Sequence, residues 1–287
     1  TINSINIGKG ANSVAGNTVL GESALDASVS GGDNTAIGKN ALTANTSGLR
    51  CTAVGSSSLE ANTEGSDLVA VGQAALKDNT TGIRNTASGR AALASNTTGG
   101  RNVGIGYAAL NVNTTASYNT AVGNAALALN TTGTQNVAVG SDVLDANTTG
   151  QHNVGIGYRS LGANTTASEN TAIGKDTLLL NTTGTQNTAV GSEALDASTT
   201  GDNNTAVGFQ ALTSATTADG NAAFGPKTLE NNTTGESNTA LGGFALRANT
   251  TASNNTAVGI NALTANTTGI NNVAVGANAL DAATTAN

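Results

Sequence analysis

The 287-residue sequence has no tryptophan and no methionine, a single proline, and aromatic residues at only 2% of its length. Charged residues make up 10%, against about a quarter in a typical globular domain. With so few bulky side chains, the chain lacks the composition of an ordinary compact core. Its 37 glycines, with abundant Asn and Thr, would suit a disordered chain, but disordered chains lack strictly periodic aliphatic residues and this one has them.

Residues that serve most functional sites are also scarce. Cys51 is the single cysteine, which excludes an intrachain disulfide, and His152 is the single histidine, which excludes the usual histidine-cluster metal sites. The net charge of −7 and the scatter of the 11 Lys and Arg argue against nucleic acid, because phosphate binding needs clustered basic residues. No apolar run approaches a transmembrane span, so we expect no membrane insertion. The sequence therefore predicts no metal, no cofactor, no catalytic residues and no enzyme.

The chain is built on a 17-residue repeat. A glycine recurs at every seventeenth position from Gly21 to Gly276, which gives sixteen coils without an insertion or deletion. One coil reads Asn119-Thr-Ala-Val-Gly-Asn-Ala-Ala-Leu-Ala-Leu-Asn-Thr-Thr-Gly-Thr-Gln135. Such a period is typical of a solenoid, in which each coil stacks on its predecessor. We expect residues 1–16 to form an irregular first coil, residues 17–287 to form the array, and the chain to be a fragment of a longer fibre.

Two rows of aliphatic residues follow this period. The residue before the glycine is Val, Ile, Leu or Phe in fifteen of the sixteen coils, and it shares one face of a short strand with the residue two places earlier, because side chains alternate along a strand. The fourth residue after the glycine is always leucine, and we expect this row to be the core: Leu25, Leu42, Leu59, Leu76, Leu93, Leu110, Leu127, Leu144, Leu161, Leu178, Leu195, Leu212, Leu229, Leu246, Leu263 and Leu280. The expected fold is all-β, a repetitive β-solenoid of the β-roll or β-helix kind. The segment around each leucine is either one helical turn or an extended turn or strand.

The strand position between the residue before the glycine and the residue two places earlier, which is Thr, Val or Ala, is Ala or Gly in every coil but the first. On a face open to water this position would vary, so we expect an identical chain to pack there too closely for more than a methyl group. The predicted contacts of this oligomer, a parallel homotrimer about a long axis, are Ala36, Ala53, Gly104, Ala121, Gly155, Ala172 and Ala189.

Asparagine recurs at two positions of the coil, once before the strand and once at the start of Asn-Thr-Thr-Gly, as at Asn130, Asn147 and Asn181. Asparagine bonds its own turn, and stacked copies can pass amide hydrogen bonds from coil to coil. We therefore expect two ladders. The phrase also matches the N-glycosylation sequon, but a ladder explains its repetition without any sugar.

The phrase Asn-Thr-Ala-Val-Gly-x-x-Ala-Leu-x-x-Asn-Thr-Thr-Gly resembles the repeats of phage tail-fibre proteins and, more distantly, the heads of trimeric autotransporter adhesins. The segment Ile5-Asn-Ile-Gly-Lys-Gly-Ala11 is similar to both. The resemblance covers about residues 3–287 and offers no catalytic motif to transfer. It implies a parallel trimer, a β-roll or β-helix shaft, a place on a virion or an extracellular or cell surface, and binding to a host-surface glycan or protein. The adhesin branch comes second because its head repeats are usually shorter than 17 residues.

Two function classes remain open at this point. The first is the structural shaft of a trimeric virion or extracellular fibre that mediates attachment to a host surface. The second is a monomeric β-solenoid that binds ice, through its regular threonine columns, or a glycan. Four aromatic residues expected on the surface, Tyr107, Tyr158, Phe209 and Phe244, are candidates for receptor or glycan contact, although singly exposed aromatics are common. Mass in solution separates a stable trimer from a monomer.

Overall fold

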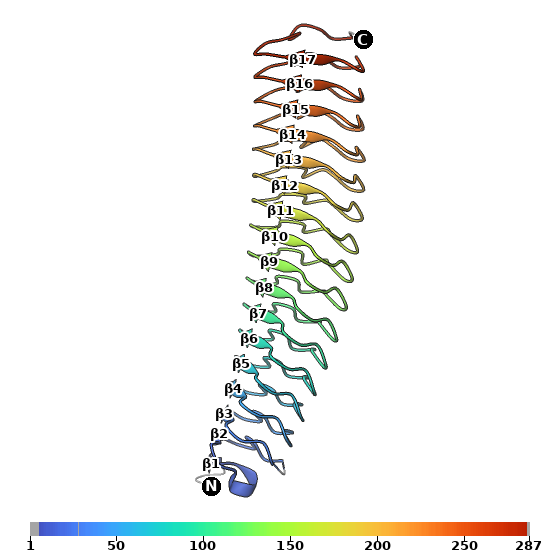
Figure 1. The fold of residues 1–287 in the computed structure, drawn as a ribbon. Coiled ribbons are helices and arrows are strands. Elements are labelled where there is room, and N and C mark those ends of the chain that lie inside the picture. The colour runs from blue at the N-terminus through green and yellow to red at the C-terminus, as the bar shows by residue number, and fades with distance from the viewer. Residues whose placement is uncertain (1–5, 28, 286–287) are drawn as a thin grey trace. The chain divides into compact units, whose positions relative to one another are not determined.

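A computed structural model describes residues 6–27 and 29–285. The chain divides into two units, Thr1–Asp142 and Val143–Asn287. In the described residues the regular elements are short strands and one 3-10 helix (Figure 1). The predicted all-β solenoid with 17-residue coils is confirmed in each unit.

The first unit has nine described strands. From β2 onward each strand pairs in parallel with the next at an offset of 17 residues, as Thr35 with Thr52, whereas β1 pairs antiparallel with β2. The predicted irregular first coil therefore contains this antiparallel strand and the 3-10 helix, and its residues 1–5 lie outside the described residues. The elements are β1 Asn6–Gly8, η1 Ala11–Ser13, β2 Thr18–Gly21, β3 Thr35–Ile37, β4 Thr52–Val54, β5 Val69–Val71, β6 Thr86–Ser88, β7 Val103–Ile105, β8 Thr120–Val122 and β9 Val137–Val139.

The second unit repeats this arrangement. Its eight described strands all pair in parallel with the same 17-residue offset, as Ala172 with Ala189. The strands are β10 Val154–Ile156, β11 Thr171–Ile173, β12 Thr188–Val190, β13 Thr205–Val207, β14 Ala222–Phe224, β15 Thr239–Leu241, β16 Thr256–Val258 and β17 Val273–Val275.

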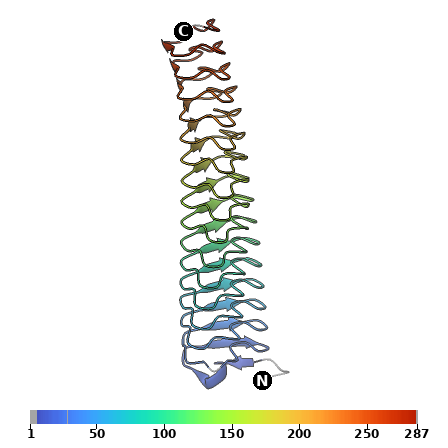
Figure 2. The ribbon, with the colours of Figure 1, turned by 90° about the vertical axis from the view of Figure 1, so that its right-hand side faces the viewer.

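After each strand and its glycine the chain forms a series of turns before the next strand begins (Figure 2). In the coil of β12, the turn segment contains Glu193 and Leu195 with φ of 59° and 52°, both in the left-handed region. Of the two structures left open for this segment, a helical turn is therefore wrong. The turns aim each leucine across the coil toward the strand.

The interior of each coil is narrow, and the leucine of the predicted core row is the large side chain that fills it in most coils. Every described leucine of the predicted core row is fully buried except Leu280, which is 50% exposed in the last coil. The leucine reaches the middle residue of a strand: a Cβ added to Gly104 would lie 3.3 Å from Cγ of Leu93. The strand wall therefore has room for a methyl group or less opposite each leucine.

The predicted oligomer contacts are wrong, because the Ala/Gly column lies inside the single chain. Its members are buried among the leucines of their own coils: Ala36, Ala53, Gly104, Ala121, Gly155, Ala172 and Ala189. They are small because the leucine from the opposite wall fills the space. The first and third residues of each three-residue strand point outward, away from the leucines.

Both asparagine rows form the expected ladders, and both are buried. In the row before the strand, the backbone N–H of Asn102 donates to Oδ1 of Asn85 at 2.9 Å, and Nδ2 of Asn102 donates to the carbonyl of Ala116 at 2.8 Å. In the other row, Nδ2 of Asn164 donates to Oδ1 of Asn147 at 2.9 Å. Apart from Oδ1 of Asn181 and Asn266, which have no hydrogen-bond partner, the ladder amides that bond from coil to coil are accommodated in the narrow interior at little desolvation cost.

A ladder asparagine should be needed for stability. Asn164→Ala removes the acceptor that Nδ2 of Asn181 uses at 3.1 Å, as well as a donor to the carbonyl of Ala167. Leaving buried polar groups unpaired is expected to lower the free energy of unfolding by about 2–4 kcal/mol, measured by urea denaturation. The control Thr166→Ala changes an exposed neighbour and should stay within about 0.5 kcal/mol. Equal stability of the two variants would contradict a structural role for the ladder.

Candidate functional site: the outer face of the sheet

The feature that stands out in each unit is the outward side of its strands. We define the outer face as the first and third residues of strands β3–β17. Because a three-residue strand turns its middle side chain inward, the other two must point away from the core. The first residues are Thr35, Thr52, Val69, Thr86, Val103, Thr120, Val137, Val154, Thr171, Thr188, Thr205, Ala222, Thr239, Thr256 and Val273, and the third are Ile37, Val54, Val71, Ser88, Ile105, Val122, Val139, Ile156, Ile173, Val190, Val207, Phe224, Leu241, Val258 and Val275.

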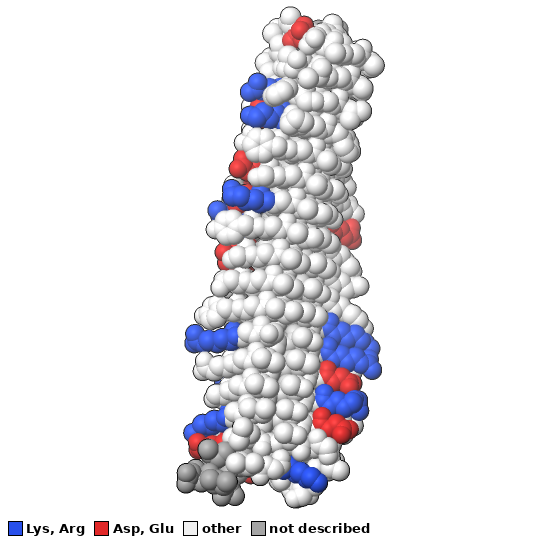
Figure 3. Space-filling view, turned by 90° about the vertical axis from the view of Figure 1, so that its left-hand side faces the viewer, with Lys and Arg blue, Asp and Glu red and all other residues white. Residues whose placement is uncertain are grey.

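The outer face carries no charge. Its third-residue column is aliphatic except for Ser88 and Phe224, whereas its first-residue column is mostly threonine with five valines and one alanine. Ile105 is 40% exposed in the first unit and Ile173 is 37% exposed in the second. Figure 3 shows an uncharged band of regular rows, with Lys, Arg, Asp and Glu gathered along its borders. A repeated column of exposed aliphatic side chains of this kind is unusual on a monomer and typical of an interaction surface.

Two columns of exposed residues border the outer face. The leading margin is the second residue before each strand, and the trailing margin is the residue that follows the repeat glycine. In the leading margin, Arg50 donates to Asp67 of the next coil at 2.6 and 3.2 Å, and this hydrogen bond lowers the pKa of the Asp67 carboxyl. In the trailing margin, Lys39 pairs with Glu22 at 3.2 Å. These exposed pairs are screened by water, so they contribute little to stability.

Three of the four predicted surface aromatics are exposed, and the four are not brought together. Tyr107, Tyr158 and Phe209 occupy the trailing margin with exposures of 52%, 48% and 48%, each in its own coil. Phe244 lies one position further along its coil and is half-buried. The sequence interpretation missed Tyr118, which is 53% exposed in the leading margin.

Several rings of the margins stack against arginines. The Arg90 guanidinium lies 5.7 Å from the centre of the Tyr107 ring, and Arg101 lies 5.2 Å from that of Tyr118. Arg159 lies 5.9 Å from the Tyr158 ring in the second unit. At such exposed sites a cation–π contact contributes about 0.5–1 kcal/mol, so these stacks fix side-chain positions along the margins.

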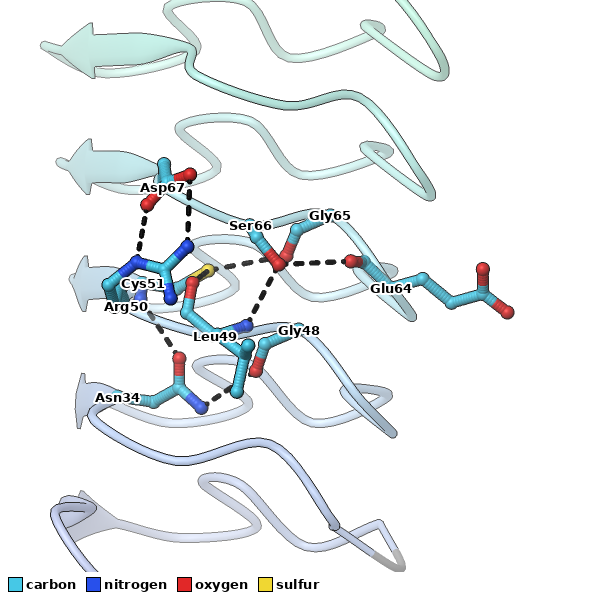
Figure 4. A network of polar contacts seen from close by, with 9 residues as sticks. All are labelled: Asn34, Gly48, Leu49, Arg50, Cys51, Glu64, Gly65, Ser66 and Asp67. Carbon is cyan, nitrogen blue, oxygen red and sulfur yellow. Dashed lines mark hydrogen bonds and ion pairs between the residues drawn. The ribbon is translucent and has the colours of Figure 1, made fainter.

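Cys51 replaces an asparagine of the ladder before the strand and is fully buried (Figure 4). Its N–H donates to Oδ1 of Asn34 at 2.9 Å, and its Sγ lies 3.4 Å from the carbonyl oxygen of Gly65. Burial raises the pKa of the thiol from 9.0 to about 11, despite partial compensation by a backbone hydrogen bond from Leu68. The thiol is therefore a protonated core group at neutral pH.

This pKa shift predicts a loss of stability at high pH. The thiol releases its proton near pH 9 in the unfolded chain and near pH 11 in the folded one. The contribution of the buried thiol to the free energy of unfolding is therefore complete below pH 9 and is lost as the pH rises from 9 to 11. Two pKa units correspond to about 2.7 kcal/mol. We expect the guanidinium unfolding midpoint to fall more between pH 7.5 and 10.5 in the parent than in Cys51→Ser. An identical fall in both proteins would contradict the shift.

The described residues hold no group of three or more His, Cys, Asp and Glu side chains placed to bind a metal ion. A pocket of about 370 Å³ in the first unit is lined by Ile7, Gly8, Lys9 and Gly10 together with Asp26 and two small residues. Lys9 and Asp26 are its only charged lining residues. Among the described residues there is also no helix that is both long and apolar enough to cross a membrane.

No protein-family model matches the chain, and no curated protein is similar to it in sequence.

Proposed function

We propose that the protein is the structural shaft of a homotrimeric fibre, of the phage tail-fibre or surface-adhesin kind, on a virion or an extracellular or cell surface. The observation that carries the proposal is the uncharged outer face with its column of exposed aliphatic residues, which each unit presents along its described strands. Copies of the chain bury this face against one another. The number three and the parallel arrangement come from the resemblance of the repeat to fibre and adhesin repeats.

Energetics support self-association through this face. Burying a Val, Leu or Ile side chain completely is worth about 1.5–3 kcal/mol. For the more exposed ones of this face, such as Ile105 at 40% and Leu241 at 49%, hiding the exposed part is worth about 0.5–1.5 kcal/mol each. Because similar residues repeat in coil after coil, these contributions add up to a large favourable free energy of association. The shaft supplies rigidity and distance through its stacked coils. Attachment to a host-surface glycan or protein follows from the resemblance, with Tyr107, Tyr158 and Phe209 as candidate contacts.

A second candidate, a monomeric ice-binding solenoid, uses the same face. Thr occupies the first strand position in most coils, for example Thr171, Thr188 and Thr205 of consecutive strands, so a flat parallel sheet presents an ordered threonine column. The two functions exclude each other because a buried face cannot contact ice.

Unheated SDS gels together with thermal hysteresis measurements separate the two functions. The fibre shaft is expected to migrate as a trimer that dissociates only on boiling and to show no thermal hysteresis. A monomer with thermal hysteresis overturns the shaft and supports ice binding instead. A monomer without thermal hysteresis overturns both.

A further inference from the structure

At one strand of each unit, the leading margin carries a carboxylate and the trailing margin carries a lysine. Residues that flank the same strand are said to lie at the same level. Strand β3 is flanked by Asp33 in the leading margin and Lys39 in the trailing margin. Strand β11 is flanked in the same way by Glu169 and Lys175. The members of each pair are six residues apart, which is about 20 Å along an extended chain, so they cannot neutralise each other within one copy.

The symmetry of association decides which margins meet. When two copies pack their outer faces together in parallel, a rotation about the stacking axis relates them, and the leading margin of one meets the trailing margin of the other at the same level. When the copies are antiparallel, leading meets leading and the levels run in opposite directions. The charge pattern of the margins therefore reports on orientation and register.

Shifting the register by one coil removes the match. In one direction Asp33 would meet Glu22, Arg50 would meet Lys39 and Arg101 would meet Arg90, all pairs of like charge. In the other direction one pair of opposite charges forms, but the pairs Asp33–Lys39 and Glu169–Lys175 are lost. Each of these carboxylates would then face a serine in place of the lysine. The unshifted register forms an opposite pair in both units.

The unshifted register also places Arg84 opposite Arg90 at the level of β6. Each of these arginines has a partner of its own chain: the charge of Arg84 acts on Asp67, and Arg90 stacks on Tyr107. Like charges at a solvated rim are screened within about 8–10 Å, so this pair is tolerated.

Resting on the proposed self-assembly, we propose that copies of this chain associate in parallel and in register. The Asp33 carboxylate of one copy accepts a hydrogen bond from the Lys39 ammonium of its neighbour, and Glu169 pairs likewise with Lys175. Such rim pairs add little affinity but select orientation and register, because a shift by one coil either brings like charges together or separates both pairs. The uncharged outer face cannot provide this selection, since each coil resembles the next.

The four side chains are available for these contacts. Asp33 and Glu169 are exposed, and the side chains of Lys39 and Lys175 are each 57% exposed. Within its own chain Lys39 pairs with Glu22, and Lys175 pairs with Asp176 at 2.5 Å. An ammonium group has three donors, so each lysine can keep this partner and bind a second carboxylate across the interface.

Engineered disulfides test the register. In a Cys51→Ser background, Asp33→Cys with Lys39→Cys, and Glu169→Cys with Lys175→Cys, should crosslink into covalent oligomers on non-reducing gels. The matched controls, Asp33→Cys with Ser56→Cys and Glu169→Cys with Ser192→Cys, move the trailing cysteine by one coil and should crosslink at least about tenfold less. A disulfide needs Cα atoms within about 7 Å, so the same-level bridge can form only between chains.

The possible outcomes separate this inference from the proposed function. Oligomers in which the shifted pairs crosslink as well as the same-level pairs, or better, overturn the register while leaving self-assembly intact. A chain that stays monomeric in every variant overturns self-assembly itself. Strong crosslinking of the same-level pairs alone supports both.

A charge exchange provides a second readout that does not depend on cysteine chemistry. Asp33→Lys places two lysines at one rim contact and should raise the dissociation constant about tenfold at low ionic strength, with a smaller effect in high salt. Adding Lys39→Asp reverses the pair and should restore the parent value. Failure of the exchange to restore assembly overturns the pair.

Discussion

Gly123→Ala is expected to lower the free energy of unfolding of the first unit by more than about 4 kcal/mol and its melting temperature by about 10 °C or more. Gly123 has φ of 143°, a region that residues with a Cβ rarely adopt. A Cβ at this position would lie 2.0 Å from the backbone carbonyl oxygen of Gly140 in the next coil. A backbone atom cannot rotate away as a side chain can, so the coils themselves must separate.

The neighbouring substitution Asn124→Ala is the matched control, because it alters an exposed residue of the same turn and should change stability by less than about 0.5 kcal/mol. Thermal melts followed by circular dichroism measure both variants. If Gly123→Ala melts within two degrees of the parent, the close stacking of coils at this glycine is contradicted.

The second large effect concerns assembly. Ile105→Glu and Ile173→Glu each place a carboxylate on the outer face, and in the proposed trimer three copies of it are buried among aliphatic side chains. Burying an unpaired charge costs several kcal/mol, so we expect each variant to dissociate at least about a thousandfold more readily than the parent, measured by sedimentation velocity. Both isoleucines are partly exposed in the single chain, so the circular dichroism spectrum should not change.

Thr98→Glu and Thr166→Glu are the controls for this prediction, because they add the same charge at exposed corner positions away from the outer face. They should leave the assembly intact. If the isoleucine variants and the threonine variants sediment alike, the outer face is not the interface.

Much of the fold could be predicted from the period of the sequence. An unbroken 17-residue repeat requires stacked coils, so the leucine row and the asparagine ladders follow from residue type and spacing. Leu25 and Leu263 are far apart in the sequence but are buried in the same way, because each coil provides the same surroundings. Cys51 and Leu68 show that a ladder position also accepts other buried residues.

The period of the sequence does not predict which face of each strand points into the core. Alternation shows that Thr35 and Ile37 share one face and that Ala36 occupies the other, but it does not say which face is the interior. The usual guide, that larger aliphatic residues lie inside, fails here because the opposite wall supplies the leucine. The left-handed conformation of residues such as Leu195 has no sequence signal either, since leucine seldom adopts it.

A local exception in the second unit shows how the two walls compensate. Val143 occupies a position that is alanine in most coils, and residue 155 of the facing strand is glycine. A Cβ on Gly155 would lie 2.6 Å from Cγ1 of Val143, so the larger side chain on one wall requires the smaller residue on the other. The small residues of the strand are therefore set by the interior of the coil.

The most direct test of self-assembly through the outer face is the mass of the purified chain by sedimentation equilibrium at micromolar concentration. One chain has a mass of 27.8 kDa, and we expect a single species of about 83 kDa, three times that value. A species of 27.8 kDa that persists as the concentration is raised would contradict the trimer and would leave the outer face as a surface open to water.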